Sequence, residues 1–87
     1  MKVIASDEEL INRFGFQYIN GNKNDEYLIR YLTKFYDPED WETYKTVYVD
    51  RKTRRIFAYN DMYDEEITLN DEYIRDLLRA RVIRKDN

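Results

Sequence analysis

The sequence predicts a small α+β domain: a three-stranded antiparallel meander flanked by an N-terminal and a C-terminal amphipathic helix, in the order αβββα. Helix-start signals and apolar stripes of helical spacing occur near each end of the 87-residue chain. Between them, residues 41–63 alternate in side-chain character, as strands do. A chain of this length forms one domain, over residues 1–87, and buries only about 60–65% of its extended surface.

The first helix is expected over residues 7–14. Ser6 and Glu9 form a capping box, in which the Ser hydroxyl accepts a hydrogen bond from one backbone N–H and the Glu side chain accepts one from another. The apolar stripe that follows consists of Leu10, Ile11 and Phe14. Gly15 is well placed to end this helix, because glycine readily adopts the left-handed conformation of a helix terminus.

The segment 26–36 (EYLIRYLTKFY) fits either a strand or a helix. A helix would align Leu28, Tyr31, Leu32 and Phe35. A strand would place Tyr27, Ile29, Tyr31, Thr33 and Phe35 on one side. We favour the strand, because β-branched and aromatic residues prefer it. Residues 41–50 and 56–63 then form a hairpin around the loop DRKTR, which starts at Asp50.

Alternation along this hairpin separates an aliphatic face from an aromatic face. The aliphatic residues are Val47, Val49, Ile56, Ala58 and Met62. The aromatic residues are Tyr44, Tyr48, Phe57, Tyr59 and Tyr63. If both helices cover the aliphatic face, the rings remain accessible on the other face.

A second helix is expected within residues 68–83 (TLNDEYIRDLLRARVI). Thr68 and Asn70 are candidate N-caps, and Asp71 and Glu72 suit the positive end of a helix. Its apolar stripe consists of Tyr73, Ile74, Leu77, Leu78 and Val82.

The composition excludes several kinds of chemistry. The chain has no His and no Cys, and its single Ser is used in the helix cap, which removes Ser-His-Asp triads, Cys-His pairs and thiolate or histidine metal sites. We therefore expect no enzyme activity, no cofactor and no metal. Asp50 and Lys52 have the local form of a carboxylate–lysine nuclease motif, which leaves a metal nuclease as a further alternative. No apolar run approaches the roughly 20 residues of a membrane span, so a cytoplasmic protein without membrane contact is expected.

Charge is distributed unevenly along the chain. Residues 45–59 carry five basic groups and one acidic group, whereas residues 60–70 carry four acidic groups and no basic one. This dipolar pattern differs from the overall basic balance of duplex-binding proteins. It leaves one alternative function open, a nucleic-acid-binding module whose hairpin tip contacts phosphates through Arg51, Lys52, Arg54 and Arg55.

The leading hypothesis is a non-catalytic protein–protein binding protein, a small inhibitor or adaptor that uses the aromatic face. Tyrosines flanked by charges are enriched in protein-binding hot spots, although exposed rings on a sheet also stack nucleic-acid bases. The expected protein-binding residues are Tyr44, Tyr48, Phe57, Tyr59, Asp61, Tyr63 and Glu65. In composition, this small, acidic, tyrosine-rich chain resembles phage-encoded inhibitors such as anti-CRISPR proteins. That resemblance implies a nucleic-acid mimic whose partner has a basic nucleic-acid-binding groove.

Overall fold

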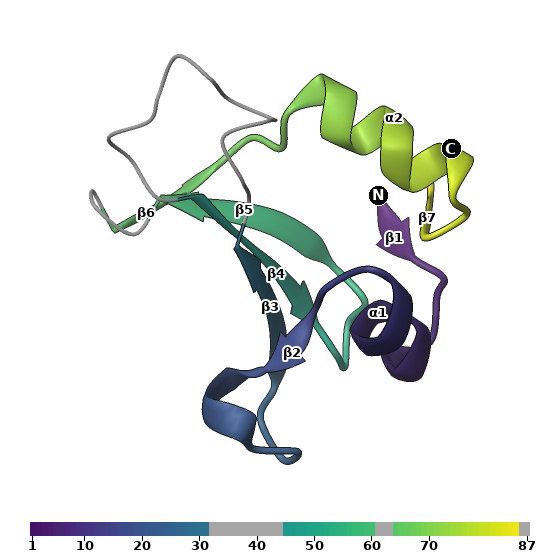
Figure 1. The fold of residues 1–87 in the computed structure, drawn as a ribbon. Coiled ribbons are helices and arrows are strands. Elements are labelled where there is room, and N and C mark those ends of the chain that lie inside the picture. Colours follow the sequence, from purple (N-terminus) through teal and green to yellow (C-terminus); the bar gives the residue numbers. More distant parts are fainter. Residues whose placement is uncertain (32–44, 61–63, 86–87) are drawn as a thin grey trace.

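The computed structural model describes residues 1–31, 45–60 and 64–85 of the chain. These residues form two α-helices, a short 3-10 helix and seven strands (Figure 1). In chain order the elements are β1 (Lys2–Val3), α1 (Asp7–Arg13), β2 (Gln17–Tyr18), η1 (Ile19–Gly21), β3 (Tyr27–Tyr31), β4 (Lys45–Asp50), β5 (Ile56–Asn60), β6 (Glu65–Ile67), α2 (Asp71–Arg79) and β7 (Ile83–Arg84).

The central sheet has five antiparallel strands in the spatial order β2-β3-β4-β5-β6, so the prediction of a three-stranded meander is wrong. The predicted meander corresponds to β3, β4 and β5, and the strand assignment is confirmed for Tyr27–Tyr31. Strands β2 and β6 extend this meander at its two edges. They contain two and three residues, too few to show an alternating pattern. The predicted strand residues 32–36, 41–44 and 61–63 lie outside the described residues.

A second, two-stranded sheet joins the two ends of the described chain. Strands β1 and β7 pair antiparallel, with Lys2 opposite Arg84 and Val3 opposite Ile83. The two ends therefore lie side by side on the same side of the molecule as both helices (Figure 1). This pairing also lies outside the predicted αβββα order.

Helix α2 is shorter than the stretch in which it was predicted. Arg81 has a φ of 59°, and its N–H donates to the carbonyl of Leu78 while the N–H of Val82 donates to the carbonyl of Leu77. These two bonds form a Schellman motif, which ends the helix. Val82 is fully buried outside the helix and does not belong to its apolar stripe. The sequence does not predict this helix end, because Arg81 occupies the position after the helix where glycine is usual.

The N-terminal caps of both helices agree with the sequence. In α1 the N–H of Glu9 donates to Ser6 Oγ over 3.1 Å, and the N–H of Ser6 donates to Glu9 Oε1 over 3.4 Å, which confirms the capping box. In α2 the side chain of Asn70 accepts from the N–H groups of Glu72 and Tyr73. Of the two predicted N-caps of α2, Asn70 is therefore the one that is used.

Both helices and the β1–β7 pair pack on one face of the five-stranded sheet (Figure 1). The sheet contributes its aliphatic residues to this core, among them Leu28, Val47, Val49, Ile56 and Ala58. The helices and the chain ends contribute Val3, Leu10, Tyr73, Leu77, Val82 and Ile83. The predicted aliphatic side of the hairpin is thus the buried side. None of the helices in the described ranges has the length and apolar character needed to cross a membrane.

Candidate functional site

Four aromatic side chains form a cluster on the sheet face opposite the helices. We call Tyr27, Tyr48, Phe57 and Tyr59 the aromatic face. Strand alternation puts them there, because their chain neighbours Leu28, Val47, Val49, Ile56 and Ala58 point into the core. Register brings them together. Tyr48 on β4 lies directly opposite Phe57 on β5, and Tyr59 is two residues after Phe57 on the same strand. Tyr27 is on β3, two residues before Ile29, which lies opposite Tyr48. All four side chains are half-buried.

Two of the rings are stacked, and each of the other two is perpendicular to Tyr48. Tyr48 and Phe57 are stacked, with 5.5 Å between centroids and 14° between planes. Tyr27 stands at 87° to the Tyr48 ring and 89° to the Phe57 ring, with centroids 6.1 and 6.2 Å apart. Tyr59 stands at 86° to Tyr48, with centroids 5.9 Å apart. Such pairs contribute about 0.5–1.5 kcal/mol each beyond their buried area. The same four side chains line an open hollow of about 300 Å³.

Charged groups border the aromatic face near Phe57 and Tyr59. The Arg55 guanidinium lies 4.8 Å from the centroid of the Phe57 ring and donates to both carboxylate oxygens of Glu66 over 2.7 Å. The Tyr59 hydroxyl donates a short hydrogen bond to Asp64. Since Arg55 and Glu66 are each about half exposed, their ion pair adds little stability. Its main effect is to hold one cation against an aromatic ring.

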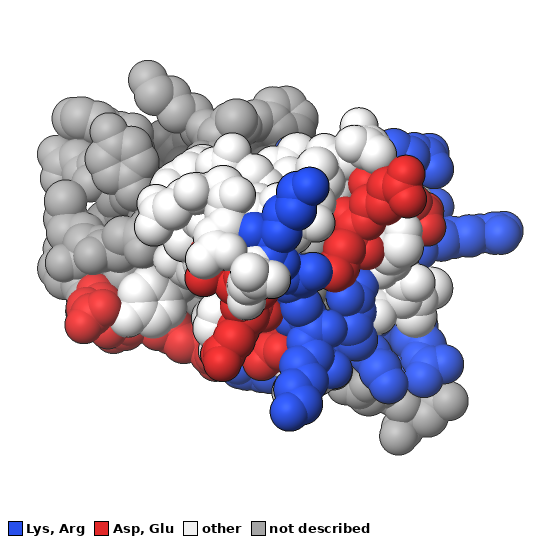
Figure 2. All heavy atoms as spheres, turned by 90° about the horizontal axis from the view of Figure 1, so that it is seen from below, with Lys and Arg blue, Asp and Glu red and all other residues white. Residues whose placement is uncertain are grey.

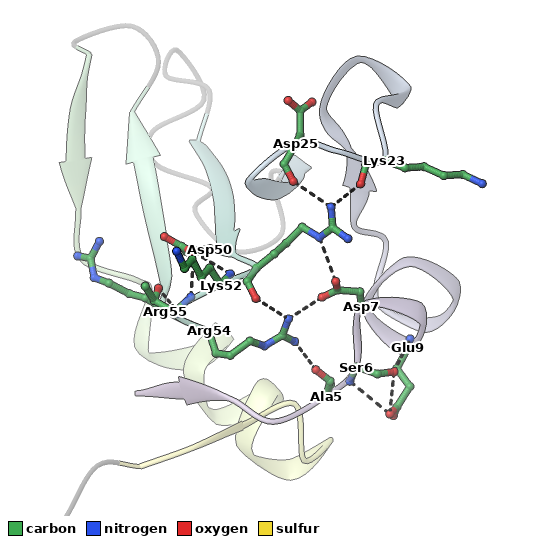
Figure 3. Close-up of polar contacts among 12 residues, drawn as sticks. Ala5, Ser6, Asp7, Glu9, Lys23, Asp25, Asp50, Lys52, Arg54 and Arg55 are labelled. Atoms are coloured by element: carbon green, nitrogen blue, oxygen red, sulfur yellow. Dashed lines mark hydrogen bonds and ion pairs between the residues drawn. The ribbon is translucent and has the colours of Figure 1, made fainter.

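Two of the four cations in the predicted basic tip, Arg51 and Arg54, form ion pairs within the protein. Arg51 Nε lies 3.0 Å from one carboxylate oxygen of Asp7, and Arg54 Nη1 lies 2.6 Å from the other (Figure 3). We call Asp7, Arg51 and Arg54 the arginine clamp. Arg51 also donates to the carbonyls of Lys23 and Asp25, over 2.7 and 2.9 Å. The clamp therefore ties the β4–β5 turn to the start of α1 and to the loop before β3.

Electrostatics favour the ionised form of the clamp carboxylate. Burial alone would raise the pKa of Asp7, but the hydrogen bonds and charges of Arg54 and Arg51 outweigh it and hold the pKa below its usual range. Arg54 also donates to the carbonyl of Ala5 over 2.5 Å. Both guanidinium groups are thus engaged by oxygen atoms of the protein itself.

Asp50 closes the β4–β5 turn. Its Oδ1 accepts hydrogen bonds from the N–H groups of Lys52 and Thr53 over 2.9 and 3.0 Å. The Thr53 bond is the main cause of a pKa below the usual range for Asp50. The turn ends at Arg54, which has a φ of 64°. Within the described part of the chain no three acidic side chains gather to hold a metal, and Asp50 acts as a turn residue.

The surface around the turn has mixed charge. A hollow of about 400 Å³ is lined by Asp7, Asp25, Glu26, Asp50, Arg51, Lys52 and Thr53. Figure 2 shows acidic side chains lying directly beside the basic ones on the face seen from below. Of the four predicted nucleic-acid contacts, Arg51 and Arg54 belong to the clamp, Arg55 pairs with Glu66, and Lys52 is exposed.

The structure brings together three of the predicted protein-binding residues, Tyr48, Phe57 and Tyr59. Glu65 is exposed. In the register of β5 and β6, Glu65 lies opposite Asn60, and its neighbour Glu66 lies opposite Tyr59. Because paired residues share a face, Glu65 lies on the opposite face from the rings, and Glu66 takes its place beside them. The predicted residues Tyr44, Asp61 and Tyr63 lie outside the described residues.

Tyr27 was absent from the predicted site, although it belongs to the hollow. The signal for it was present, since alternation along residues 27–31 puts Tyr27 on the same strand face as Ile29 and Tyr31. Placing that face beside Tyr48 requires the register between β3 and β4, in which Ile29 pairs with Tyr48. The sequence alone did not supply this register.

Comparison with protein-family models, curated proteins and solved structures finds no match to this chain.

Proposed function

We propose that the protein is a non-catalytic binding protein that docks onto another protein through its aromatic face. The observation that carries this proposal is the open hollow between Tyr27, Tyr48, Phe57 and Tyr59, on the sheet face away from both helices. Aromatic side chains contribute large contact areas and lose little conformational entropy on binding. Tyr27 and Tyr48 also carry hydroxyl groups that can exchange water for hydrogen bonds with a partner.

Charge complementarity favours a partner with a basic surface. The chain carries a net charge of −3. Three consecutive acids, Asp64, Glu65 and Glu66, lie at the β6 edge of the sheet, and two of them contact groups of the aromatic face or its border. A basic surface of the kind that binds nucleic acid would complement these carboxylates. A protein bound there would exclude the nucleic acid and act as an inhibitor, as the compositional resemblance to phage-encoded inhibitors implies.

This proposal accounts for more of the geometry than nucleic-acid binding by the β4–β5 turn. Arg51 and Arg54 already share the negative charge of Asp7, which weakens their attraction to a phosphate. The charge of Arg55 is partly offset by Glu66 in the same way. Lys52 alone of the four has no ion pair among the described residues, and one phosphate contact gives only weak, strongly salt-dependent binding.

Affinity capture tests the proposal. The wild-type chain and a Tyr27→Ala/Tyr59→Ala variant are immobilised, and proteins retained from the organism that encodes the chain are identified by mass spectrometry. The double variant leaves the stacked Tyr48–Phe57 pair in place. Hot-spot truncations cost 2 kcal/mol or more, so we expect at least about 30-fold weaker capture of the specific partner. Added DNA should release a partner that binds through a nucleic-acid groove.

The matched control is Ile4→Ala, because Ile4 is 52% exposed and directly follows β1, which packs on the helix-bearing face of the sheet. It should capture the same partner as the wild type. Circular dichroism and urea unfolding of all three proteins verify that the fold is retained. Equal capture by the wild type and the double variant, with both folded, would show that the aromatic face is not the binding surface.

A further inference from the structure

We propose that the hollow between Tyr27, Tyr48, Phe57 and Tyr59 is a cage for a cation, and that it receives the ammonium group of a lysine side chain of the partner protein. This inference rests on the proposed function, because it names the group that the partner inserts. The chemistry it invokes is cation–π attraction, in which a positive charge lies against the negative faces of aromatic rings.

The ring orientations suit a compact cation. Tyr48 and Phe57 lie nearly parallel, and Tyr27 is almost perpendicular to both. Tyr59 is another ring perpendicular to Tyr48, so the four rings that line the hollow differ in orientation. A planar guanidinium contacts one flat surface best, whereas an ammonium group is compact and can approach several walls at once. This geometry therefore favours lysine over arginine as the inserted residue.

One ring of the aromatic face already holds a cation. The Arg55 guanidinium carbon is 4.8 Å from the Phe57 centroid, within the roughly 6 Å range of cation–π attraction. Glu66 fixes this guanidinium at the border of the face through two 2.7 Å hydrogen bonds. The hollow itself is lined by the four aromatic residues, without Arg55. The chain's own arginine thus shows the affinity of these rings for positive charge and leaves the hollow open.

Acidic groups at both ends of the aromatic face add to the attraction. Asp64 accepts from the Tyr59 hydroxyl, and Glu66 lies opposite Tyr59 in the sheet register. At the other end, Asp50 lies opposite Tyr27. Arg55 pairs with Glu66 and the charge of Lys52 acts on Asp50, so among these described residues three carboxylates face two positive charges. The field at the hollow is therefore negative, which complements a lysine head group.

The test is an NMR titration of the whole chain with three blocked tripeptides: acetyl-Gly-Lys-Gly-amide, its Nε-trimethyl-lysine analogue and its norleucine analogue. If the cage operates, the ε-methylene protons of lysine and the N-methyl protons of trimethyl-lysine shift upfield, since they lie over ring faces. The norleucine peptide should bind about 2- to 5-fold more weakly than either cationic peptide.

Two variants locate the binding. Tyr27→Leu/Tyr59→Leu keeps apolar bulk at both positions but removes two rings, and should weaken binding of the lysine and trimethyl-lysine peptides about 2- to 5-fold for each ring. Tyr31→Leu is the matched control, because Tyr31 is 59% exposed on the same strand as Tyr27 but does not line the hollow. It should leave both affinities unchanged. Amide spectra of each variant verify that the fold is retained.

Three results would overturn the inference. Equal binding of norleucine would mean that the hollow selects apolar bulk, without regard to charge. Binding of lysine but not of trimethyl-lysine would assign the attraction to hydrogen bonds with the carboxylates. Absence of upfield shifts with every peptide would show that the hollow does not bind a cation. The proposed function would still stand in that case if partner capture depends on Tyr27 and Tyr59. Conversely, if the cationic peptides bind but the Tyr27→Ala/Tyr59→Ala variant captures the partner as well as the wild type does, the proposed function is refuted and the cation site remains.

Discussion

Replacing Asp7 with Asn should lower the free energy of unfolding by about 2–3 kcal/mol. The Asp7 carboxylate contacts two guanidinium groups at 3.0 and 2.6 Å, and the three side chains are about a quarter exposed. Exposed ion pairs contribute about 0.2–1 kcal/mol, and hydrogen bonds to charged groups contribute about 1.5–3 kcal/mol. We take about 1 kcal/mol for each contact, which is the upper end of the first range and below the second. Asp7 is also the first residue of α1, where a negative charge contributes about 0.5 kcal/mol.

The matched control is Asp71→Asn. Asp71 is the first residue of α2 and is exposed, and it has no ion pair among the described residues. Its replacement removes only the interaction with the helix dipole, so a loss of about 0.5 kcal/mol is expected. Urea unfolding followed by circular dichroism at 222 nm gives both values, provided that the slope of free energy against urea is unchanged. Equal losses in the two variants would refute the structural role assigned to the arginine clamp.

Two further predictions concern pH and the border of the aromatic face. Because the pKa of Asp7 is lower in the folded than in the unfolded chain, its stabilisation is complete above about pH 4–5 and is lost as the pH falls through the folded-state pKa. The stability difference between wild type and Asp7→Asn, measured by urea unfolding, should therefore be constant from pH 7 to 5 and shrink below about pH 4; a difference that persists to pH 2 would contradict this. Arg55→Gln should uncover the Phe57 ring and leave Glu66 unpaired, so the affinity for the lysine tripeptide should rise about 2- to 5-fold by NMR titration, with a stability change below about 1 kcal/mol. A fall in affinity would show that Arg55 supports the hollow instead of competing for it.

The sequence predicted the helix caps and the two faces of the hairpin, because these features depend on residues that are close together in the chain. The capping box at Ser6 and Glu9 and the cap at Asn70 depend on residues within three positions of one another, and both are present. The separation of Tyr48 and Phe57 from Val47 and Ala58 depends only on alternation along each strand, and it is also present. These features could be read without knowing how distant segments pair.

Long-range pairing was not predictable in the same way. Strands β1 and β7 have two residues each and are paired across almost the whole chain. Arg51 and Arg54 look like solvent-exposed charges in the sequence, since their partner Asp7 lies 44 and 47 positions away. Charge alone left a phosphate-binding tip open as an alternative, and it could not show that two of the four cations contact Asp7. Tyr27 was missed as a site residue for the same reason, because the β3–β4 register decides its neighbours.

The pairing of β1 with β7 has a consequence for engineering. Lys2 and Arg84 lie opposite each other, so a chain of residues 1–85 can be linked head to tail by a short peptide without disturbing the five-stranded sheet. A cyclic backbone of this kind loses conformational entropy mainly in its unfolded state, and it should therefore melt at a higher temperature than the linear chain. The linkage would lie on the helix-bearing side and leave the rings facing solvent.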